Sequence, residues 1–238
     1  MNLILFEPDE LARPLPRDDR RAQHLTAVLR RGPGERFDAG IVNGPRGKAT
    51  IVATGPEGLT LAFTAEFPPP PPDPIQLVIG LPRPQTARDI LRDATTLGAG
   101  ALHFVRTEKA EPSYATSSLW TSGEWRRHVI AGAEQAFDTR IPEVTVGETL
   151  EATLGRFSAA AGLALDNYEA AAPLSTCEFP ATRPLVLALG PERGWSAVDR
   201  EILRRHAFRL VHLGPRVLRT EAAVLASLTL ARARLGLM

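Results

Sequence analysis

The chain has 238 residues, of which 44% are hydrophobic and 23% are charged, and its formal net charge is +1. This composition fits a globular protein of one or two domains, and the near-neutral charge does not by itself indicate a nucleic-acid-binding protein. No apolar run reaches the roughly 18 residues of a membrane helix. The single Cys177 excludes a disulfide framework and a multi-cysteine zinc site, and the five histidines have no metal-ligand spacing. We therefore expect a cytoplasmic protein with neither a membrane segment nor a metal site.

Residues 1–67 are predicted to form a small β-barrel with one helix. Turns rich in glycine and proline separate four β-like segments: Leu3–Phe6, Glu35–Ala39, Ala49–Ala53 and Leu59–Phe63. Between the first two, the pattern of Asp19–Arg30 is helical, with these apolar residues on one face: Ala22, Leu25, Val28 and Leu29. A domain of this size buries only a small core, so we expect it to lean on its neighbour.

Arginine supplies nearly all the positive charge, because Lys48 and Lys109 are the only lysines. The planar guanidinium suits phosphate better than the point charge of lysine. A genome rich in G and C would explain the overall excess equally well. It explains less easily the local cluster of Arg13, Arg17, Arg20, Arg21, Arg30, Arg31 and Arg36 in the first forty residues.

A proline-rich linker, residues 68–74, marks a domain boundary, because proline fits neither a helix interior nor a central strand. In residues 75–238, strand-like and helix-like segments alternate, which predicts a mostly parallel sheet covered by helices. The predicted strands are Ile75–Ile79, Ala101–Val105, Gly162–Asp166, Leu185–Ala188 and Leu210–Leu213. The helices predicted before the last two strands are Arg88–Leu97 and Glu124–Phe137.

Two glycine-containing loops follow the last two predicted strands, at residues 189–196 (LGPERGWS) and 213–222 (LGPRVLRTEA). Glycine lets the backbone approach a ligand, and ligands of open α/β sheets sit beyond the carboxyl ends of the strands. Neither loop has the glycine spacing of a dinucleotide or Walker motif. Their proline and apolar residues suit an adenine ring and a thioether better than a phosphate chain. This argues against a nucleotide-dependent enzyme, and the lack of ligands argues against a metal hydrolase.

The helices after these loops have recognisable starts. Ser196 and Asp199 form a predicted capping box, so Ser196 is assigned a structural rather than a nucleophilic role. Thr220 is predicted to cap the last helix, with Glu221 in its first turn. Arg219 at that position opposes the helix dipole, which indicates a negatively charged partner. Residues 222–231 are apolar on nearly all sides, which predicts burial either inside the chain or at a subunit interface.

Both loops resemble the last motifs of the SPOUT-class methyltransferases, and the form of these motifs resembles the RsmE family in particular. His24-Leu25 with Val28-Leu29-Arg30, Leu97-Gly98 and Ala133-Glu134-Gln135 also fall where related family motifs fall. The resemblance implies an α/β fold with a C-terminal SPOUT domain, residues 75–238, containing a trefoil knot, and a PUA-like β-barrel at residues 1–67. It implies a homodimer that uses S-adenosylmethionine to methylate N3 of a uridine in 16S ribosomal RNA, as naked RNA or in the small ribosomal subunit.

The same resemblance implies roles for residues of this chain. Arg219 would stabilise the anion that develops on the base, with Glu192 or Glu221 accepting the proton or holding Arg219. The N-terminal residues expected to contact RNA are His24, Arg20, Arg21, Arg30 and Arg31. The residues expected to hold the cofactor are Leu165, Asp166, Leu189, Gly190, Pro191, Gly194, Leu213, Gly214, Leu218 and Thr220.

The chain departs from the family pattern at four places. Arg193 replaces the first glycine of a Gly-Gly pair, and Thr96 replaces a glutamate before Leu97-Gly98. Phe137 and Asp138 occupy a stretch where an arginine is usual, and Asn2-Leu3 replaces basic residues. These departures leave open a second interpretation, a catalytically inactive or retargeted RNA-binding protein with the same fold.

Overall fold

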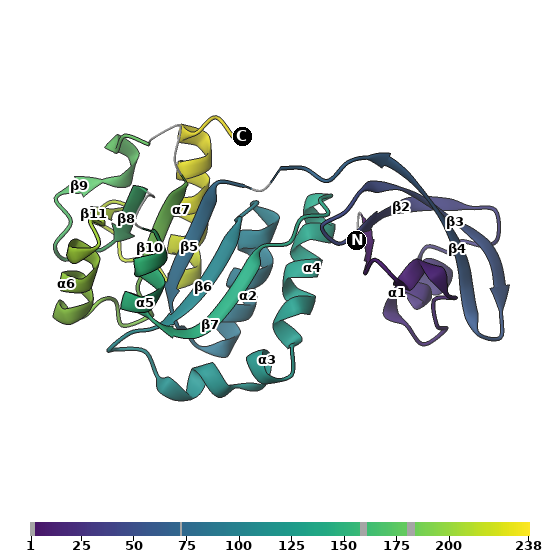
Figure 1. Cartoon of the computed structure of the whole chain (residues 1–238), viewed down its shortest axis with the longest axis horizontal. Helices are drawn as coiled ribbons and strands as arrows, with labels where there is room; N and C mark the ends of the chain where they lie inside the picture. Colours follow the sequence, from purple (N-terminus) through teal and green to yellow (C-terminus); the bar gives the residue numbers. More distant parts are fainter. Residues whose placement is uncertain (1–2, 72, 158–160, 180–183) are drawn as a thin grey trace. The chain divides into compact units, whose positions relative to one another are not determined.

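The computed structural model describes residues 3–71, 73–157, 161–179 and 184–238. The chain divides into two compact units (Figure 1). One unit holds Met1–Pro71 and Ala133–Ile141, and the other holds Pro72–Gly132 and Pro142–Met238. The first division falls inside the proline-rich linker. Residues 133–141, which the sequence places in the C-terminal domain, instead belong to the first unit.

The first unit contains a four-stranded sheet of β1 (Ile4–Phe6), β2 (Arg36–Ile41), β3 (Arg46–Gly55) and β4 (Gly58–Phe67). The strands lie in this order, with β1 parallel to β2 and the other neighbours antiparallel. The four predicted strands are confirmed, with bounds that differ by a few residues. Among the described residues β1 and β4 are the opposite edges of the sheet, so closure into a barrel stays a prediction.

The predicted helix of the first unit is only partly regular. It consists of α1 (Arg20–Gln23) followed directly by a π-helical turn, His24–Val28. Ala22 and Leu25 are buried as expected, but Val28 and Leu29 are 66% and 44% exposed. A π turn changes the number of residues per turn, so the 3.6-residue spacing no longer brings later side chains to the same face. The prediction of one continuous apolar face was wrong for these two residues.

Residues 133–141 belong to the first unit because they bond to its strands. The backbone amide of Leu5 donates to Oε1 of Glu134 at 3.1 Å, and Thr139 Oγ1 donates to the carbonyl of Gly44 at 2.7 Å. Arg46 Nη1 donates to the carbonyl of Phe137 at 2.7 Å. Burial raises the pKa of the Glu134 carboxyl. Each of these bonds joins residues about 90 or more apart in the chain, beyond the reach of local sequence patterns.

The second unit contains a seven-stranded sheet with the order β7-β6-β5-β10-β8-β11-β9. Its strands are β5 (Ile75–Gly80), β6 (Ala101–Arg106), β7 (Glu143–Thr149), β8 (Ala161–Leu165), β9 (Ala172–Pro173), β10 (Leu185–Leu189) and β11 (Arg209–His212). All neighbouring pairs are parallel. The five predicted strands are confirmed. The sequence missed β7 and β9, the two edge strands, because each has only one neighbour and few buried residues to produce a strong apolar pattern.

The helices of the chain from residue 84 onward are α2 (Pro84–Thr96), α3 (Ser118–Thr121), α4 (Glu124–Ala136), α5 (Leu150–Leu154), α6 (Ala197–Arg205) and α7 (Thr220–Arg234). The predicted capping box of α6 is confirmed. Ser196 Oγ accepts from the amide of Asp199 at 3.0 Å, and Asp199 Oδ2 accepts from the amide of Ser196 at 2.9 Å. No helix in the described parts is long and apolar enough to cross a membrane.

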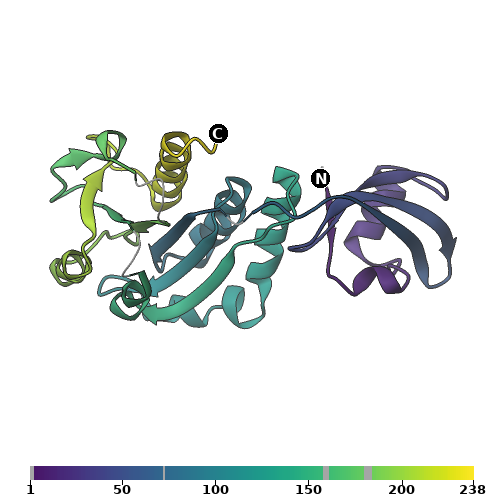
Figure 2. The ribbon, with the colours of Figure 1, turned by 45° about the horizontal axis from the view of Figure 1, so that its top comes forward.

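Helix α7 differs from its prediction at its start. Thr220 was expected at the N-cap, but Arg219 occupies that position with an extended backbone, and its side chain makes no capping hydrogen bond. Thr220 is the first helical residue and is buried. One face of α7, with Val224, Leu228 and Ala231, packs on α2, β5 and β10 (Figure 1, Figure 2). This face is therefore buried inside the chain, which was one of the two alternatives for the apolar helix.

Candidate active site

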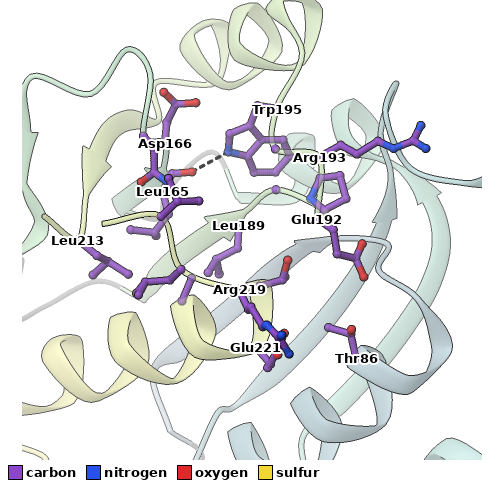
Figure 3. A pocket seen from close by; sticks show the side chains of 18 of the residues that line it. Thr86, Leu165, Asp166, Leu189, Glu192, Arg193, Trp195, Leu213, Arg219 and Glu221 are labelled. Atoms are coloured by element: carbon purple, nitrogen blue, oxygen red, sulfur yellow. Dashed lines mark hydrogen bonds between the residues drawn. The ribbon is translucent and has the colours of Figure 1, made fainter. Parts of the chain in front are cut away.

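A cavity of about 710 Å³ opens at the carboxyl ends of β8 and β10 in the second unit (Figure 3). Its volume is within the range of small-molecule sites. The two loops predicted from the sequence form most of its wall, together with the turn after β8 and the start of α2. The lining residues are Arg83, Thr86, Leu165, Asp166, Asn167, Tyr168, Leu189, Gly190, Pro191, Glu192, Arg193, Gly194, Trp195, Leu213, Arg216, Val217, Leu218, Arg219, Thr220, Glu221 and Ala223.

The first loop, residues 189–196, is a tight turn that depends on one glycine. Gly194 has φ +65° and donates its amide to the carbonyl of Pro191 at 2.7 Å. A side chain is strained in this left-handed region. Arg193 does not have a positive φ, so an arginine fits there without backbone strain. The departure from the family's Gly-Gly pair is therefore compatible with the loop conformation.

Three contacts hold the first loop against the sheet. A Cβ atom at Gly80, the last residue of β5, would lie 2.4 Å from Pro191 Cδ and 2.6 Å from Pro191 N, so the loop packs directly on the strand. Trp195 Nε1 donates to the carbonyl of Leu165 at 2.9 Å. Lys109 Nζ donates to the carbonyl of Trp195 at 3.0 Å and to that of Arg193 at 3.4 Å. Trp195 is buried, so it both fills the core and walls the cavity.

The second loop, residues 213–220, is far more exposed. Val217 is 81% exposed, Leu218 is 37% exposed, and Arg216 and Arg219 are exposed as well. Near its start, the amide of Gly214 donates to Nδ1 of His212 at 3.0 Å. Gly214 is the only residue of the predicted cofactor set that does not line the cavity. Its backbone amide is already used by this local bond.

Asp166 is a wall residue whose carboxylate is already engaged. Its Oδ1 accepts from the amides of Tyr168 and Glu169 at 2.8 and 2.6 Å, and its Oδ2 accepts from Arg200 Nε at 2.8 Å. Both Asp166 and Arg200 are buried. The Asp166 carboxylate therefore stabilises the turn after β8. Its neighbours Leu165, Asn167 and Tyr168 also line the cavity.

The three predicted catalytic side chains all line the cavity. Figure 3 shows Glu192, Arg219 and Glu221 toward the end of the pocket where Thr86 lies, with Asp166 and Trp195 toward the other end. Oε1 of Glu192 accepts from the amide of Arg83, the N-cap of α2, at 2.9 Å. Glu221 is half-buried in the first turn of α7. Arg219 has no ion pair within the described part of the chain.

Sequence reasoning missed several wall residues. Arg83 and Thr86 enter from the start of α2, and Asn167 and Tyr168 follow Asp166. The predicted strand Gly162–Asp166 ended one residue too late: the amide of Asp166 still donates to the carbonyl of Val211, but its carboxylate already forms the turn after β8. Ligand residues were predicted in the loops that follow the strands Leu185–Ala188 and Leu210–Leu213, and the same rule applied to the turn after Gly162–Asp166 would have included Tyr168. No local signal marks Arg83, since the fold brings it to residues more than 100 positions later.

The predicted RNA-contact residues lie in the first unit, where one of them has a structural role. Arg21 is bonded to Glu10, Asp19 and the carbonyl of Leu5, and its hydrogen bonds to Glu10 lower the pKa of that carboxyl. Arg30 is exposed, and the side chain of Arg20 is 75% exposed. Nη1 of Arg31 lies 3.8 Å from Oε1 of Glu35, within ion-pair distance. His24 is half-buried, and its Nε2 has no hydrogen-bond partner among the residues described.

Metal-ligating side chains do not gather at the cavity or elsewhere in residues 3–71, 73–157, 161–179 and 184–238. No group of three or more histidine, cysteine, aspartate or glutamate side chains in these ranges could hold a metal ion. Cys177 is buried, and its thiol lies 3.5 Å from the carbonyl of Pro173.

Comparison with known proteins agrees with this architecture. Residues 69–232 match the model of the RNA methyltransferase domain family. The ribosomal RNA small subunit methyltransferase E of Treponema pallidum is 35% identical over 237 residues, which cover 95% of this chain and 89% of that protein. The ribosomal RNA small subunit methyltransferase E 1 of Borreliella burgdorferi is 25% identical over 95% of both chains.

A solved structure shares the whole fold. The crystal structure of a ribosomal RNA small subunit methyltransferase E from Neisseria gonorrhoeae, bound to S-adenosyl methionine, superposes with a TM-score of 0.78. It covers 98% of this chain and 97% of that chain at 23% identity. This structure shows the shared fold, and the family model and the first relative show the family: this chain belongs to the ribosomal RNA small subunit methyltransferase E (RsmE) family.

Proposed function

We propose that this protein uses S-adenosylmethionine to methylate N3 of a uridine in 16S ribosomal RNA. Family membership supports the methylation of small-subunit RNA. The observation that carries the proposal is the cavity itself. Two loops and the turn after β8 surround a pocket with a buried apolar floor, and Arg219 at its wall has no ion pair among the described residues.

The residues of the cavity suit this cofactor. Leu189, Pro191 and Trp195 are buried and provide an apolar floor for an adenine ring, with half-buried Leu165 and Leu213 beside them. Carboxylates at Glu192 and Glu221 favour a cationic sulfonium over a phosphate chain, and neither loop has the composition of a phosphate cradle. S-Adenosylmethionine, when bound, supplies an electrophilic methyl group. The backbone of the two loops would hold it, except at Gly214.

Arg219 is the proposed catalytic cation. Uridine must lose its N3 proton before or during transfer, and negative charge then develops on the base oxygens. A fixed guanidinium beside these oxygens stabilises that charge, and removing one such donor typically costs about 100- to 1,000-fold in rate. At the N-cap of α7, Arg219 opposes the helix dipole and makes no capping bond, so its position lacks a structural reason.

The carboxylates are proposed to differ in role. Glu192 is held by the amide of Arg83 and ties the first loop to the start of α2. No side-chain hydrogen bond of Glu221 is present among the described residues. Glu221 is the second residue of α7, two positions after Arg219 at the N-cap. We assign to Glu221 the acceptance of the proton or the holding of Arg219, and to Glu192 the positioning of the loop.

RNA is proposed to contact the first unit through Arg20, Arg30, Arg31 and His24. Arg21 is withdrawn from this set, because its guanidinium is already bonded to two carboxylates and a carbonyl. The Watson–Crick edge of a paired uridine is inaccessible, so the target must be unpaired or flipped out. Basic residues that hold neighbouring phosphates would position it.

Four further features of the family complete the proposal: a trefoil knot, a PUA-like barrel, a homodimer and a cytoplasmic location. The sheet order supports the knot, because β8 lies between β10 and β11 although it precedes both in the chain. The mixed sheet and short helix of the first unit are compatible with a barrel. The exposed Leu230 of α7 leaves part of the apolar helix free for a partner subunit.

The alternative of a catalytically inactive protein loses its main argument. It rested on Arg193, whose backbone is compatible with the arginine, and on the missing arginine near Phe137, which belongs to the first unit. Neither departure alters the floor of the cavity or Arg219.

The proposed function is tested with Arg219→Ala and the matched control Arg209→Ala, an exposed arginine outside the cavity. We expect Arg219→Ala to lower the methylation rate at least 100-fold, while calorimetry gives a cofactor affinity within a few-fold of wild type. Arg209→Ala should behave as wild type. Mass spectrometry of digested 16S RNA, or of small subunits, identifies the product as N3-methyluridine. Unchanged turnover in Arg219→Ala would remove this residue from the chemistry, and a wild-type protein without methylation would refute the function.

A further inference from the structure

Tyr168 is an exposed aromatic residue on the wall of the cavity. Tyr168 is 80% exposed, although it lines the same cavity as buried Leu189 and Trp195. A large ring left in solvent gains little from folding, because its apolar surface is not removed from water. The backbone that carries the ring is nevertheless held in place, because the amide of Tyr168 donates to Asp166.

A buried ion pair between Asp166 and Arg200, extended by the exposed Glu169 and Arg204, holds the turn that carries Tyr168. Asp166 accepts from the amides of Tyr168 and Glu169 and pairs with Arg200. Arg200 Nη1 also lies 3.4 Å from Oε1 of Glu169, which pairs with Arg204 as well. The guanidinium carbon of Arg200 lies 5.4 Å from the centroid of the Tyr168 ring, within cation–π range. One face of the ring is thus held by a buried cation, and the other face is available to a ligand.

The charge of the cavity changes from its floor to its rim. The buried residues of the floor are mostly apolar, whereas four exposed arginines lie at the rim: Arg83, Arg193, Arg216 and Arg219. None of them has an ion pair in the described part of the chain. Figure 3 shows Arg193 extending away from Leu189 and Leu213. A cationic rim around an apolar floor fits a polyanion lying over the mouth of a pocket that holds a small molecule.

We propose that Tyr168 is a stacking platform for a nucleobase of the RNA substrate, a base that flanks the reacting uridine. This inference rests on the proposed function. The platform is in the turn after β8, with Asp166, whereas Arg219 and Glu221 lie toward the opposite end of the pocket in Figure 3. The stacked base is therefore distinct from the base that reacts. Exposed aromatic rings bind bases of any sequence through their π faces, and rim arginines bind the adjoining phosphates.

The test compares Tyr168→Ala, Tyr168→Leu and Tyr168→Phe with Tyr114→Ala, which alters the only other tyrosine, outside the cavity. Fluorescence anisotropy measures binding of a labelled 16S RNA fragment, and calorimetry measures binding of S-adenosylmethionine. We expect the alanine and leucine variants to bind RNA at least fivefold more weakly with unchanged cofactor affinity. The phenylalanine variant, which keeps the ring, and Tyr114→Ala should stay within twofold of wild type.

Two results would overturn the platform. One is wild-type RNA affinity in Tyr168→Ala. The other is a loss of cofactor affinity in that variant, which would mean that the ring stacks on the adenine of the cofactor. The anisotropy measurement needs no turnover, so it separates this inference from the proposed function. A wild-type protein that binds RNA but leaves it unmethylated refutes the function alone.

Discussion

The two loops of the cavity have similar sequences and very different environments. Both start with Leu-Gly-Pro after a strand and end at the start of a helix. The first loop is held by Gly80, Lys109 and the indole bond of Trp195. The second exposes five consecutive residues, Pro215 to Arg219, and within the described part of the chain it has one side-chain hydrogen bond, at Gly214.

This difference indicates that the walls of the pocket are prepared to different degrees. A loop that is already held in its bound conformation loses little conformational entropy when a ligand binds. A loop with few contacts loses more, and this loss lowers the affinity. Arg219 lies in the second, exposed loop. We therefore infer that the first loop is preformed for the proposed cofactor and that the second loop, with Arg219, becomes ordered when ligands bind. The following predictions test this contrast, in order of decreasing effect.

Gly80→Ala should break the first loop. Its Cβ would lie 2.4 Å from Pro191 Cδ and 2.6 Å from Pro191 N, and the backbone there cannot move without displacing the loop. Overpacking of this kind typically costs about 1–3 kcal/mol. We expect at least tenfold weaker binding of S-adenosylmethionine by calorimetry. Gly155→Ala is the matched control, because nothing lies within 4 Å of its added Cβ. Equal cofactor affinity in the two variants would contradict the packing of the loop on β5.

Trypsin should distinguish the loops without any substitution. Local opening controls cleavage of a native chain, and exposed segments with few contacts open most easily. We expect cleavage after Arg216 to be at least fivefold faster than cleavage after Arg193, as measured by mass spectrometry at early times. S-Adenosylmethionine should slow the cut after Arg216 more than the cut after Arg193. Faster cleavage at Arg193 would show that the first loop is the less ordered wall.

Lys109→Met should loosen the first loop slightly. The variant loses the hydrogen bonds to the carbonyls of Trp195 and Arg193, but water can replace the lysine because its side chain is exposed. We expect about threefold weaker cofactor binding with little change in melting temperature. Lys48→Met, which alters the only other lysine and its pair with Asp38 in the first unit, is the control. If both lysine variants bind the cofactor as wild type does, Lys109 does not position the loop.

Strong local patterns made much of the fold predictable. The buried strands of the second unit are short runs of apolar residues such as Leu185–Leu189, which are visible without a partner. The capping box at Ser196 follows from residue types three positions apart, and it was confirmed. Patterns failed at Val28 and Leu29, where a π-helical turn breaks the 3.6-residue spacing, and at the edge strand β7, where burial is too weak to mark the strand.

The sequence by itself determined the two loops, the strands that precede them and nine of the ten predicted cofactor residues that line the cavity, because glycine, proline and apolar runs act over a few positions. Only the tertiary structure decided that Arg21 is a structural residue, that residues 133–141 join the first unit and that Tyr168 stands on the wall with one face held by Arg200. These outcomes depend on bonds and contacts between residues far apart in the chain. Such pairs leave no periodic trace in a single sequence.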